Sequence, residues 1–88
     1  MNYAFSQQAW DDYQHWQTTD RKKIKRINDL LKDISRNKFT GIGKPEPLKE
    51  KLSGYWSRRI DEAHRLVYRL TGIPGEETCE VYQCKGHY

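Results

Sequence analysis

The sequence is poor in apolar residues and has no long run of them. Only 35% of its 88 residues are hydrophobic. A membrane-spanning helix needs about 20 consecutive, mostly apolar residues, and the N-terminal segment carries Asp11 and Asp12 where a signal peptide would be apolar. We therefore expect neither a membrane segment nor a signal peptide, and we expect a cytoplasmic protein.

Cysteine and histidine are also scarce, with two and three copies. Cys79 and Cys84 are five positions apart, and on one strand this spacing would point them to opposite faces. A disulfide between them would have poor geometry, so reduced thiols are favoured. A zinc site needs about four ligands, whereas the histidines are scattered at positions 15, 64 and 87. The sequence thus predicts no metal site and no other cofactor.

Positive charge is what the sequence has in excess. Sixteen Lys and Arg residues against twelve Asp and Glu residues give a formal charge of +4. The excess lies in residues 20–38, with eight basic and three acidic residues, and in residues 44–69, with seven and four. This balance favours a polyanionic partner, although the first run could equally be the solvated face of a helix. The length allows one small domain, residues 1–88.

Local patterns predict two helices and four strands. Ser6 and Asp20 can each cap a helix, one over residues 7–18 and one over residues 20–37, and the short join predicts an antiparallel pair. Strands are predicted at residues 2–5 and 78–84, with a hairpin of strands 55–60 and 63–70 between them. Residues 38–47 hold two glycines and two prolines and predict little regular structure; residues 48–52 could form a helical turn.

The side-chain periods assign faces to these elements. On the first helix, core packing is predicted for Ala9, Trp10, Tyr13 and Trp16, with base stacking by Trp10 or Trp16 as the less favoured alternative. In the hairpin, Arg65 is expected to point away from the core, and His64 is expected to be a hydrogen-bonded structural histidine. Arg58 falls between two core positions, so either a bulge intervenes or Arg58 lies beyond the packed part.

The polar residues of the second half match what internal cleavage of RNA requires. A base must remove the proton of the ribose 2′-hydroxyl, cations must hold the charge on phosphorus, and an acid must protonate the leaving oxygen. Glu46, between two prolines, is the candidate base, and His87 is the candidate acid. The candidate cations are Lys49, Arg59 and Arg65. Against this, Glu46 could lie in a plain turn and His87 in a disordered tail.

Several short segments, spread over nearly the entire chain, form a recognisable pattern. They are GKPEPLK at 43–49, LSGYWSRRI at 52–60, HRLVY at 64–68, the final His87 and Tyr88, and the shorter WDDY at 10–13 and KRIN at 25–28. Together they closely resemble the YoeB toxins of bacterial toxin-antitoxin systems, within the RelE superfamily. The chain departs from that pattern in its longer turn, TGIPGEET, and in Gly86, where a larger side chain is expected before the terminal histidine.

The resemblance implies an α+β fold, with two N-terminal helices packed on one face of a small antiparallel sheet and a concave, basic opposite face. It implies an mRNA endoribonuclease that cuts the codon in the ribosomal A site without a metal, leaving a 2′,3′-cyclic phosphate and a 5′-hydroxyl. By position, Glu46 is the implied general base and His87 the general acid, Arg65 and Lys49 lie beside the phosphate, and Arg59 and Tyr88 support them.

The resemblance also implies partners. A YefM/Phd-type antitoxin would lay its C-terminal segment over the toxin, operator DNA would be bound only through that complex, and a homodimer is an open alternative. Two other functions remain open from the residues. The chain could be a basic RNA-binding module without catalysis, or an inactive toxin relative that acts with its antitoxin in repression of their operon.

Overall fold

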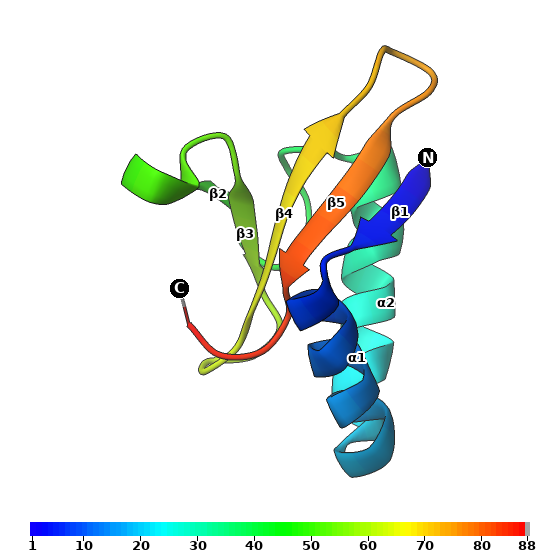
Figure 1. Ribbon diagram of the computed structural model, residues 1–88, viewed down its shortest axis with the longest axis vertical. Helices are drawn as coiled ribbons and strands as arrows, with labels where there is room; N and C mark the ends of the chain where they lie inside the picture. The colour runs from blue at the N-terminus through cyan, green and yellow to red at the C-terminus, as the bar shows by residue number, and fades with distance from the viewer. Residues whose placement is uncertain (88) are drawn as a thin grey trace.

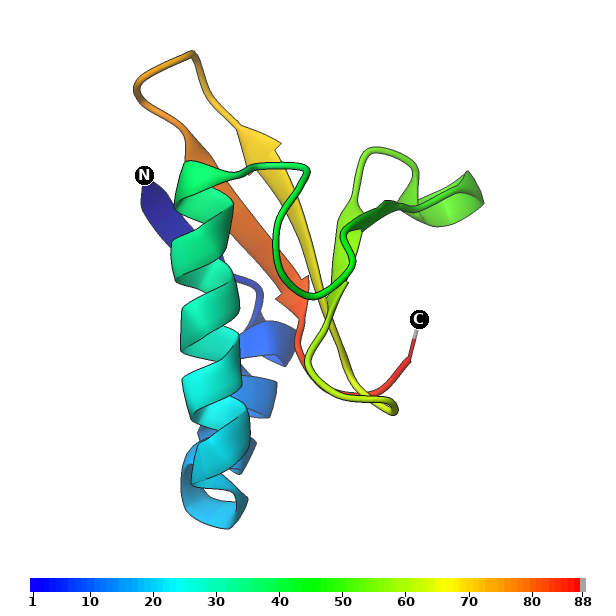
Figure 2. The ribbon, with the colours of Figure 1, turned by 180° about the vertical axis from the view of Figure 1, so that it is seen from behind.

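The computed structural model describes residues 1–87, so the role expected for Tyr88 lies outside the described residues. The elements are β1 (Asn2–Phe5), α1 (Gln7–Thr19), α2 (Arg21–Arg36), β2 (Glu46–Pro47), the short 3-10 helix η1 (Glu50–Leu52), β3 (Trp56–Arg59), β4 (Arg65–Thr71) and β5 (Thr78–Gln83). The strands form one sheet in the order β1-β5-β4-β3-β2, and both helices cover one face of it (Figures 1 and 2). The predicted α+β class with two helices on one face is confirmed.

The sheet is mixed, which corrects the expectation of a purely antiparallel one. β1 runs parallel to β5, with Asn2 opposite Thr78 and Phe5 opposite Val81, while the remaining neighbours are antiparallel. The parallel pair follows from connectivity, because β1 leads directly into α1 and the chain reaches β5 only after crossing the rest of the sheet. A two-residue strand, β2, also forms where little regular structure was expected. Its one proline, Pro47, lacks an amide donor and lies on an edge strand, where proline is tolerated.

Both helices begin where the sequence predicts. The hydroxyl of Ser6 accepts a hydrogen bond from the backbone N–H of Ala9 at 3.0 Å, and the carboxylate of Asp20 accepts one from Lys22 at 3.1 Å. The buried faces of α1 and α2 meet residues of β3, β4 and β5 in one core, with Ala9, Trp16, Ile27, Leu30, Ile34, Leu66, Tyr68 and Val81 among its members. The caps thus set the first residue of each helix, and with it which side chains face the sheet.

Trp10 does not join the core, so that prediction is wrong. Its side chain is 44% exposed and lies parallel to the ring of Tyr13, with centroids 6.0 Å apart. The helical period that places Ala9 and Trp16 against the sheet leaves Trp10 at the margin of the stripe, where its ring contacts those of Tyr13 and Phe5.

Arg58 is fully buried, and neither expected explanation for it holds. It lies in a regular part of β3, opposite Leu66, on the face that packs against the core. Its guanidinium donates to the carboxylate of Asp33 at 2.6 Å and to the hydroxyl of Tyr68 at 3.2 Å. It also donates to the backbone carbonyls of Asn37, Thr40 and Ile42. Arg58 therefore holds the loop between α2 and β2. These hydrogen bonds compensate for the water that its guanidinium loses on burial.

A β-bulge in β5 explains the cysteines. Val67 pairs with Gln83 while its neighbour Tyr68 pairs with Val81, so Tyr82 is an extra residue without a partner on β4. The extra residue shifts the alternation by one position. Cys79 and Cys84 therefore both lie in the core, fully buried and with free thiols, instead of on opposite faces. The reason given for expecting reduced thiols is therefore wrong, because the two side chains share the core face.

Within residues 1–87, none of the helices combines the length and the apolar character that crossing a membrane would require.

Candidate functional site

Strand pairing places most of the candidate residues on one face of the sheet. Glu46 on β2 lies opposite Ser57 on β3, and Arg59 on β3 lies opposite Arg65 on β4. Residues directly opposite share a face, as do residues two apart on a strand. Trp56, Leu66 and Tyr68, at the alternate positions, pack in the core. Glu46, Ser57, Arg59 and Arg65 therefore lie on the face turned away from the helices, which we term the open face.

The distances on this face follow from strand geometry. Two residues directly opposite have Cβ atoms roughly 4.5–5.5 Å apart, and two positions along a strand span about 7 Å. Arg59 and Arg65 are thus neighbours, and Glu46 lies one diagonal step from Arg59. Two like charges directly opposite destabilise a sheet, and an anion bound between the two guanidinium groups would offset that repulsion.

Glu46 is exposed and held by a constrained backbone. Pro45 and Pro47 flank it, and Lys44 has a left-handed φ of 51°, which costs energy for a residue with a side chain. The carbonyl of Gly43 accepts a hydrogen bond from the N–H of Arg59 at 2.7 Å, and the N–H of Leu48 donates to Tyr55 at 2.9 Å. The segment before and after Glu46 is therefore fastened to β3 on both sides.

Lys49 lies at the outer edge of the sheet. It is exposed and directly precedes η1, three residues beyond Glu46. The strand pairings that bring Glu46, Arg59 and Arg65 together do not include it.

Arg65 is on the open face, as predicted, but its side chain is only 9% exposed. Its Nη1 donates to the carbonyl oxygens of Asp61 at 2.7 Å, His64 at 3.1 Å and Glu62 at 3.2 Å. The guanidinium thus closes the turn that joins β3 to β4. Within the hairpin, its position is therefore set by the backbone of the turn.

Charged residues from α2 anchor the same turn. The ammonium group of Lys23 lies 2.8 Å from the carboxylate of Asp61 and 3.3 Å from that of Asp20. The carboxylate of Asp61 also accepts hydrogen bonds from the N–H groups of Ala63 and His64. Burial acts to raise the pKa of Asp61, but the hydrogen bonds from Lys23 and the two amides outweigh it and lower that pKa to about 2. Asp61 is therefore ionised at neutral pH.

The C-terminal tail is fastened beside Arg65. The N–H of Arg65 donates to the carbonyl of Gly86 at 3.1 Å, and the N–H of Gly86 donates to Nδ1 of His64 at 2.8 Å. Gly86 has a φ of +81°, a conformation that side chains rarely adopt. His87, which is exposed, follows directly and so leaves the sheet next to Arg65. The expectation that His64 is a hydrogen-bonded structural histidine is confirmed.

Two residues of α1 support the tail, and the sequence reasoning missed both roles. The indole N–H of Trp16 donates to the carbonyl of Cys84 at 2.9 Å, and its ring packs edge-on against His64, with centroids 4.8 Å apart. The carboxylate of Asp12, 4% exposed, accepts from the N–H of Cys84 at 3.0 Å. A signal was present: Asp12 lies within the apolar stripe between Ala9 and Trp16, where an acid needs a hydrogen-bonding partner.

The arrangement offers a carboxylate that can accept a proton, two adjacent guanidinium groups for a phosphate, and an imidazole that can donate a proton. Glu46, Arg59, Arg65 and the residue before His87 occupy four neighbouring segments, in the order β2, β3, β4 and tail. Among residues 1–87, no three His, Cys, Asp or Glu side chains cluster in a way that could hold a metal ion.

Comparisons with known proteins agree with this fold. Residues 5–88 match the family described as "YoeB-like toxin of bacterial type II toxin-antitoxin system". The chain is 52% identical to Toxin YoeB of Streptomyces coelicolor over 88 residues, all of both chains. It is also similar to the YoeB dimer of Staphylococcus aureus, with a TM-score of 0.90 and 48% identity, and to the heterotetrameric YoeB-YefM toxin-antitoxin complex of that organism, with a TM-score of 0.89 and 48% identity. Each structural match covers 100% of this chain and 98% of the other.

Proposed function

This chain belongs to the YoeB-like toxins of bacterial type II toxin-antitoxin systems, and on that premise we propose that it is a ribosome-dependent endoribonuclease that cuts mRNA in the A site and stops translation. The observation that carries the proposal is the grouping of Glu46, Arg59 and Arg65 on the open face, with the tail that bears His87 fastened to Arg65. The concave, basic shape expected for this face stays a prediction.

The reaction that fits these groups is an internal transfer at phosphorus. Glu46 takes the proton of the ribose 2′-hydroxyl, and the oxygen attacks the adjacent phosphorus. The bond to the 5′-oxygen of the next nucleotide breaks, and His87 protonates that oxygen. The products are a 2′,3′-cyclic phosphate and a 5′-hydroxyl, and we propose that side chains supply the acid and the base without a metal.

The cations hold the charge that builds up on the phosphate during this transfer. We assign Arg65 and Lys49 to the phosphate oxygens, with Arg59 and Tyr88 in support. The bonds from Arg65 to the hairpin turn all use Nη1, and we propose that the remaining edge of its guanidinium faces the phosphate. Because the turn already fixes this side chain, little reorganisation is needed when charge develops.

An antitoxin partner is proposed by analogy with a relative. The Staphylococcus aureus YoeB is solved as a complex with YefM and also as a dimer. We propose that a YefM/Phd-type antitoxin neutralises this chain in the cytoplasm, that the complex binds operator DNA, and that the free toxin self-associates.

The test is to mix the purified protein with translating ribosomes and map where the message is cut. We expect cuts within the A-site codon, with cyclic phosphate and 5′-hydroxyl ends, and little cutting of free RNA run in parallel. Similar cutting of free RNA would indicate an ordinary ribonuclease. An uncut message would favour the non-catalytic binding module or the repressor.

A further inference from the structure

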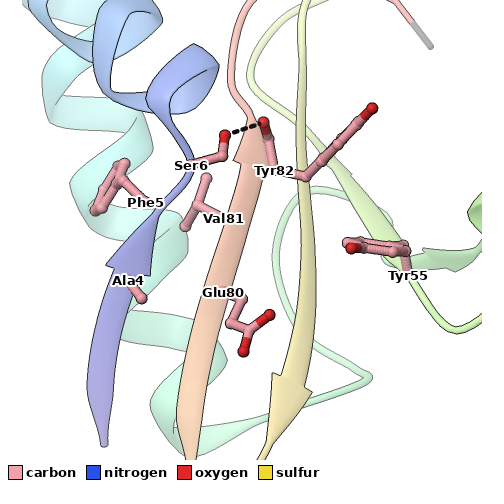
Figure 3. A pocket seen from close by; sticks show the side chains of 7 residues that line it. All are labelled: Ala4, Phe5, Ser6, Tyr55, Glu80, Val81 and Tyr82. Carbon is pink, nitrogen blue, oxygen red and sulfur yellow. Dashed lines mark hydrogen bonds between the residues drawn. The ribbon is translucent and has the colours of Figure 1, made fainter.

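A hollow of about 240 Å³ lies on the open face between β1 and the segment before β3 (Figure 3). Tyr55 and Tyr82 lie at its side, Glu80 at its base, and Ala4 and Ser6 along β1 and its end. None of these residues has a part in the proposed cleavage. The volume equals that of about eight water molecules in the liquid, at about 30 Å³ each, and falls below the roughly 300 Å³ at which pockets for drug-sized ligands begin. The hollow therefore limits a ligand to a small group, about the size of one ring system.

An aromatic ring lies at the side of this hollow. Because Val81 faces the core, the alternation along β5 turns the next residue, Tyr82, to the open face, and the bulge leaves Tyr82 without a partner on β4. The hydroxyl of Ser6 donates to the carbonyl of Tyr82 at 2.7 Å, which holds the bulge against β1. The ring of Tyr82 is 43% exposed and lies 5.5 Å from that of Tyr55, tilted by 55°. The exposed ring of Tyr82 is thus offered to a ligand that can stack, with Tyr55 beside it.

The base of the hollow is polar but carries little net charge. The guanidinium of Arg69 binds the carboxylate of Glu80 at 2.7 Å and lies over the ring of Tyr55, 5.1 Å from its centroid. The hydroxyl of Thr71 donates to the other oxygen of Glu80 at 3.1 Å. The Arg69 charge is therefore already matched, and Glu80 would repel a phosphate at this point. A carboxylate instead accepts hydrogen bonds from N–H donors, such as the N4 amino group of cytosine.

The hollow lies on the strand next to the one that carries Arg65, close to the proposed site of cleavage. Gln83, the residue after Tyr82, pairs with Val67, and Val67 is two positions from Arg65 on the same face of β4. Two positions on a strand span about 7 Å. A nucleotide whose phosphate lay at Arg65 would thus have a neighbour whose base could reach the hollow.

We propose that this hollow is a nucleobase subsite, in which Tyr82 stacks on a base next to the scissile phosphate, Tyr55 lies beside that base, and Glu80 selects a base that carries an exocyclic amino group. The proposal rests on the proposed function, since it takes RNA to be the substrate. It adds a preference that the cleavage residues do not provide, because phosphate contacts carry no sequence information.

The experiment uses short RNAs that cannot be cleaved. The 2′-O-methyl trinucleotides CCC and UUU are titrated into the full chain, and backbone amide signals are followed by NMR. Cytosine and uracil stack alike but differ in the amino group, so CCC should bind roughly tenfold more tightly than UUU. The amides of Ser6, Val81 and Tyr82 should shift. In Glu80→Met, which keeps the length of the side chain but removes the oxygen acceptors, the difference between CCC and UUU should fall to within about twofold.

Matched variants separate stacking from a general loss of structure. Tyr82→Leu should weaken binding of CCC roughly 5- to 100-fold. Phe39→Leu removes another exposed aromatic ring, which packs on Trp56 away from the hollow, and should bind as the wild type does. Equal binding of CCC by Tyr82→Leu and Phe39→Leu, or shifts confined to residues outside the hollow, would overturn the subsite.

The two proposals fail in different ways. If the protein binds CCC through the hollow but leaves ribosome-bound mRNA intact, the subsite stands and the endoribonuclease is lost. If the message is cut and Tyr82→Leu cuts the same positions at the same rate, with no preference between CCC and UUU, the subsite is lost and the enzyme stands.

Discussion

The Nδ1 atom of His64 accepts a hydrogen bond from the backbone N–H of Gly86 at 2.8 Å. The carbonyl of the same glycine accepts a hydrogen bond from the N–H of Arg65, so His64 and Arg65 together hold both backbone groups of Gly86. His64 must present an unprotonated Nδ1 to accept this bond, and the edge-on ring of Trp16 fixes its plane. The position of His87 thus depends on a histidine that has no contact with the substrate in our proposal.

Loss of this acceptor should slow cleavage by releasing the tail. In His64→Leu we expect turnover on ribosomes to fall roughly 10- to 100-fold, since misplacing a catalytic group by about 1 Å costs that much. His64→Asn places an amide oxygen near the position of Nδ1 and should restore much of the rate. If the Leu variant cleaves as fast as the Asn variant, His64 does not position the tail.

Acid should weaken the anchoring of the β3–β4 turn. The pKa of Asp61 is about 2 in the folded chain and about 3.9 when unfolded, so its contribution to stability is complete above about pH 4 and is lost as the pH falls toward 2. One third of the carboxylate is exposed, and after allowance for solvent screening we expect about 1 kcal/mol. Urea unfolding of wild type and Asp61→Asn should differ by this amount at pH 6 and converge near pH 2. A constant difference would contradict the role of its charge.

Arg58 and its neighbour Arg59 should separate stability from activity. Arg58→Met removes the cation paired with Asp33 and the donor to three loop carbonyls, and we expect a loss of about 3–5 kcal/mol in the free energy of unfolding. Arg59→Met alters an exposed side chain and should change stability by no more than about 0.5 kcal/mol, while it slows cleavage. Chemical denaturation measures the first effect, and a stable Arg58→Met variant would show that the loop does not depend on this side chain.

The two thiols should resist modification while the chain is folded. Burial raises the pKa of Cys79 and of Cys84 to about 12, and the thiolate is the reactive form. Labelling with a disulfide reagent at pH 8 should be slow for the native protein and fast in denaturant. Rapid reaction of both thiols under native conditions would mean that the bulge does not turn Cys84 into the core.

The elements that local chemistry determines were predictable from the sequence. Ser6 and Asp20 lie next to the helices they cap, and the alternating residues of the hairpin lie within the strands they predict. The structure confirms both caps and the hairpin. The parallel pairing of β1 with β5 is set by contacts far apart in the sequence, which no local pattern contains. The bulge at Tyr82 likewise has no glycine or proline to announce it, and it reversed the predicted face of Cys84.

In the candidate site, too, some features follow from local patterns in the sequence and others depend on distant contacts. The faces of Arg59 and Arg65 follow from period-two alternation, so their pairing could be predicted. The buried guanidinium of Arg58 could not, because its partners come from a loop of irregular backbone. The tail is anchored by His64 at Gly86 and by Trp16 and Asp12 at Cys84. Of these three, a hydrogen-bonding role was predicted only for His64, since Trp16 was expected as a core residue.

The most direct test of the whole account is single-turnover cleavage of ribosome-bound mRNA by Glu46→Ala and His87→Ala, with Glu76→Ala, an exposed glutamate of the β4–β5 turn, as the matched control. If Glu46 and His87 act as base and acid, each of the first two variants should cleave at least about a hundredfold more slowly than wild type, and the control should match wild type. Rates within about tenfold of wild type for both variants would contradict acid-base cleavage by this face of the sheet.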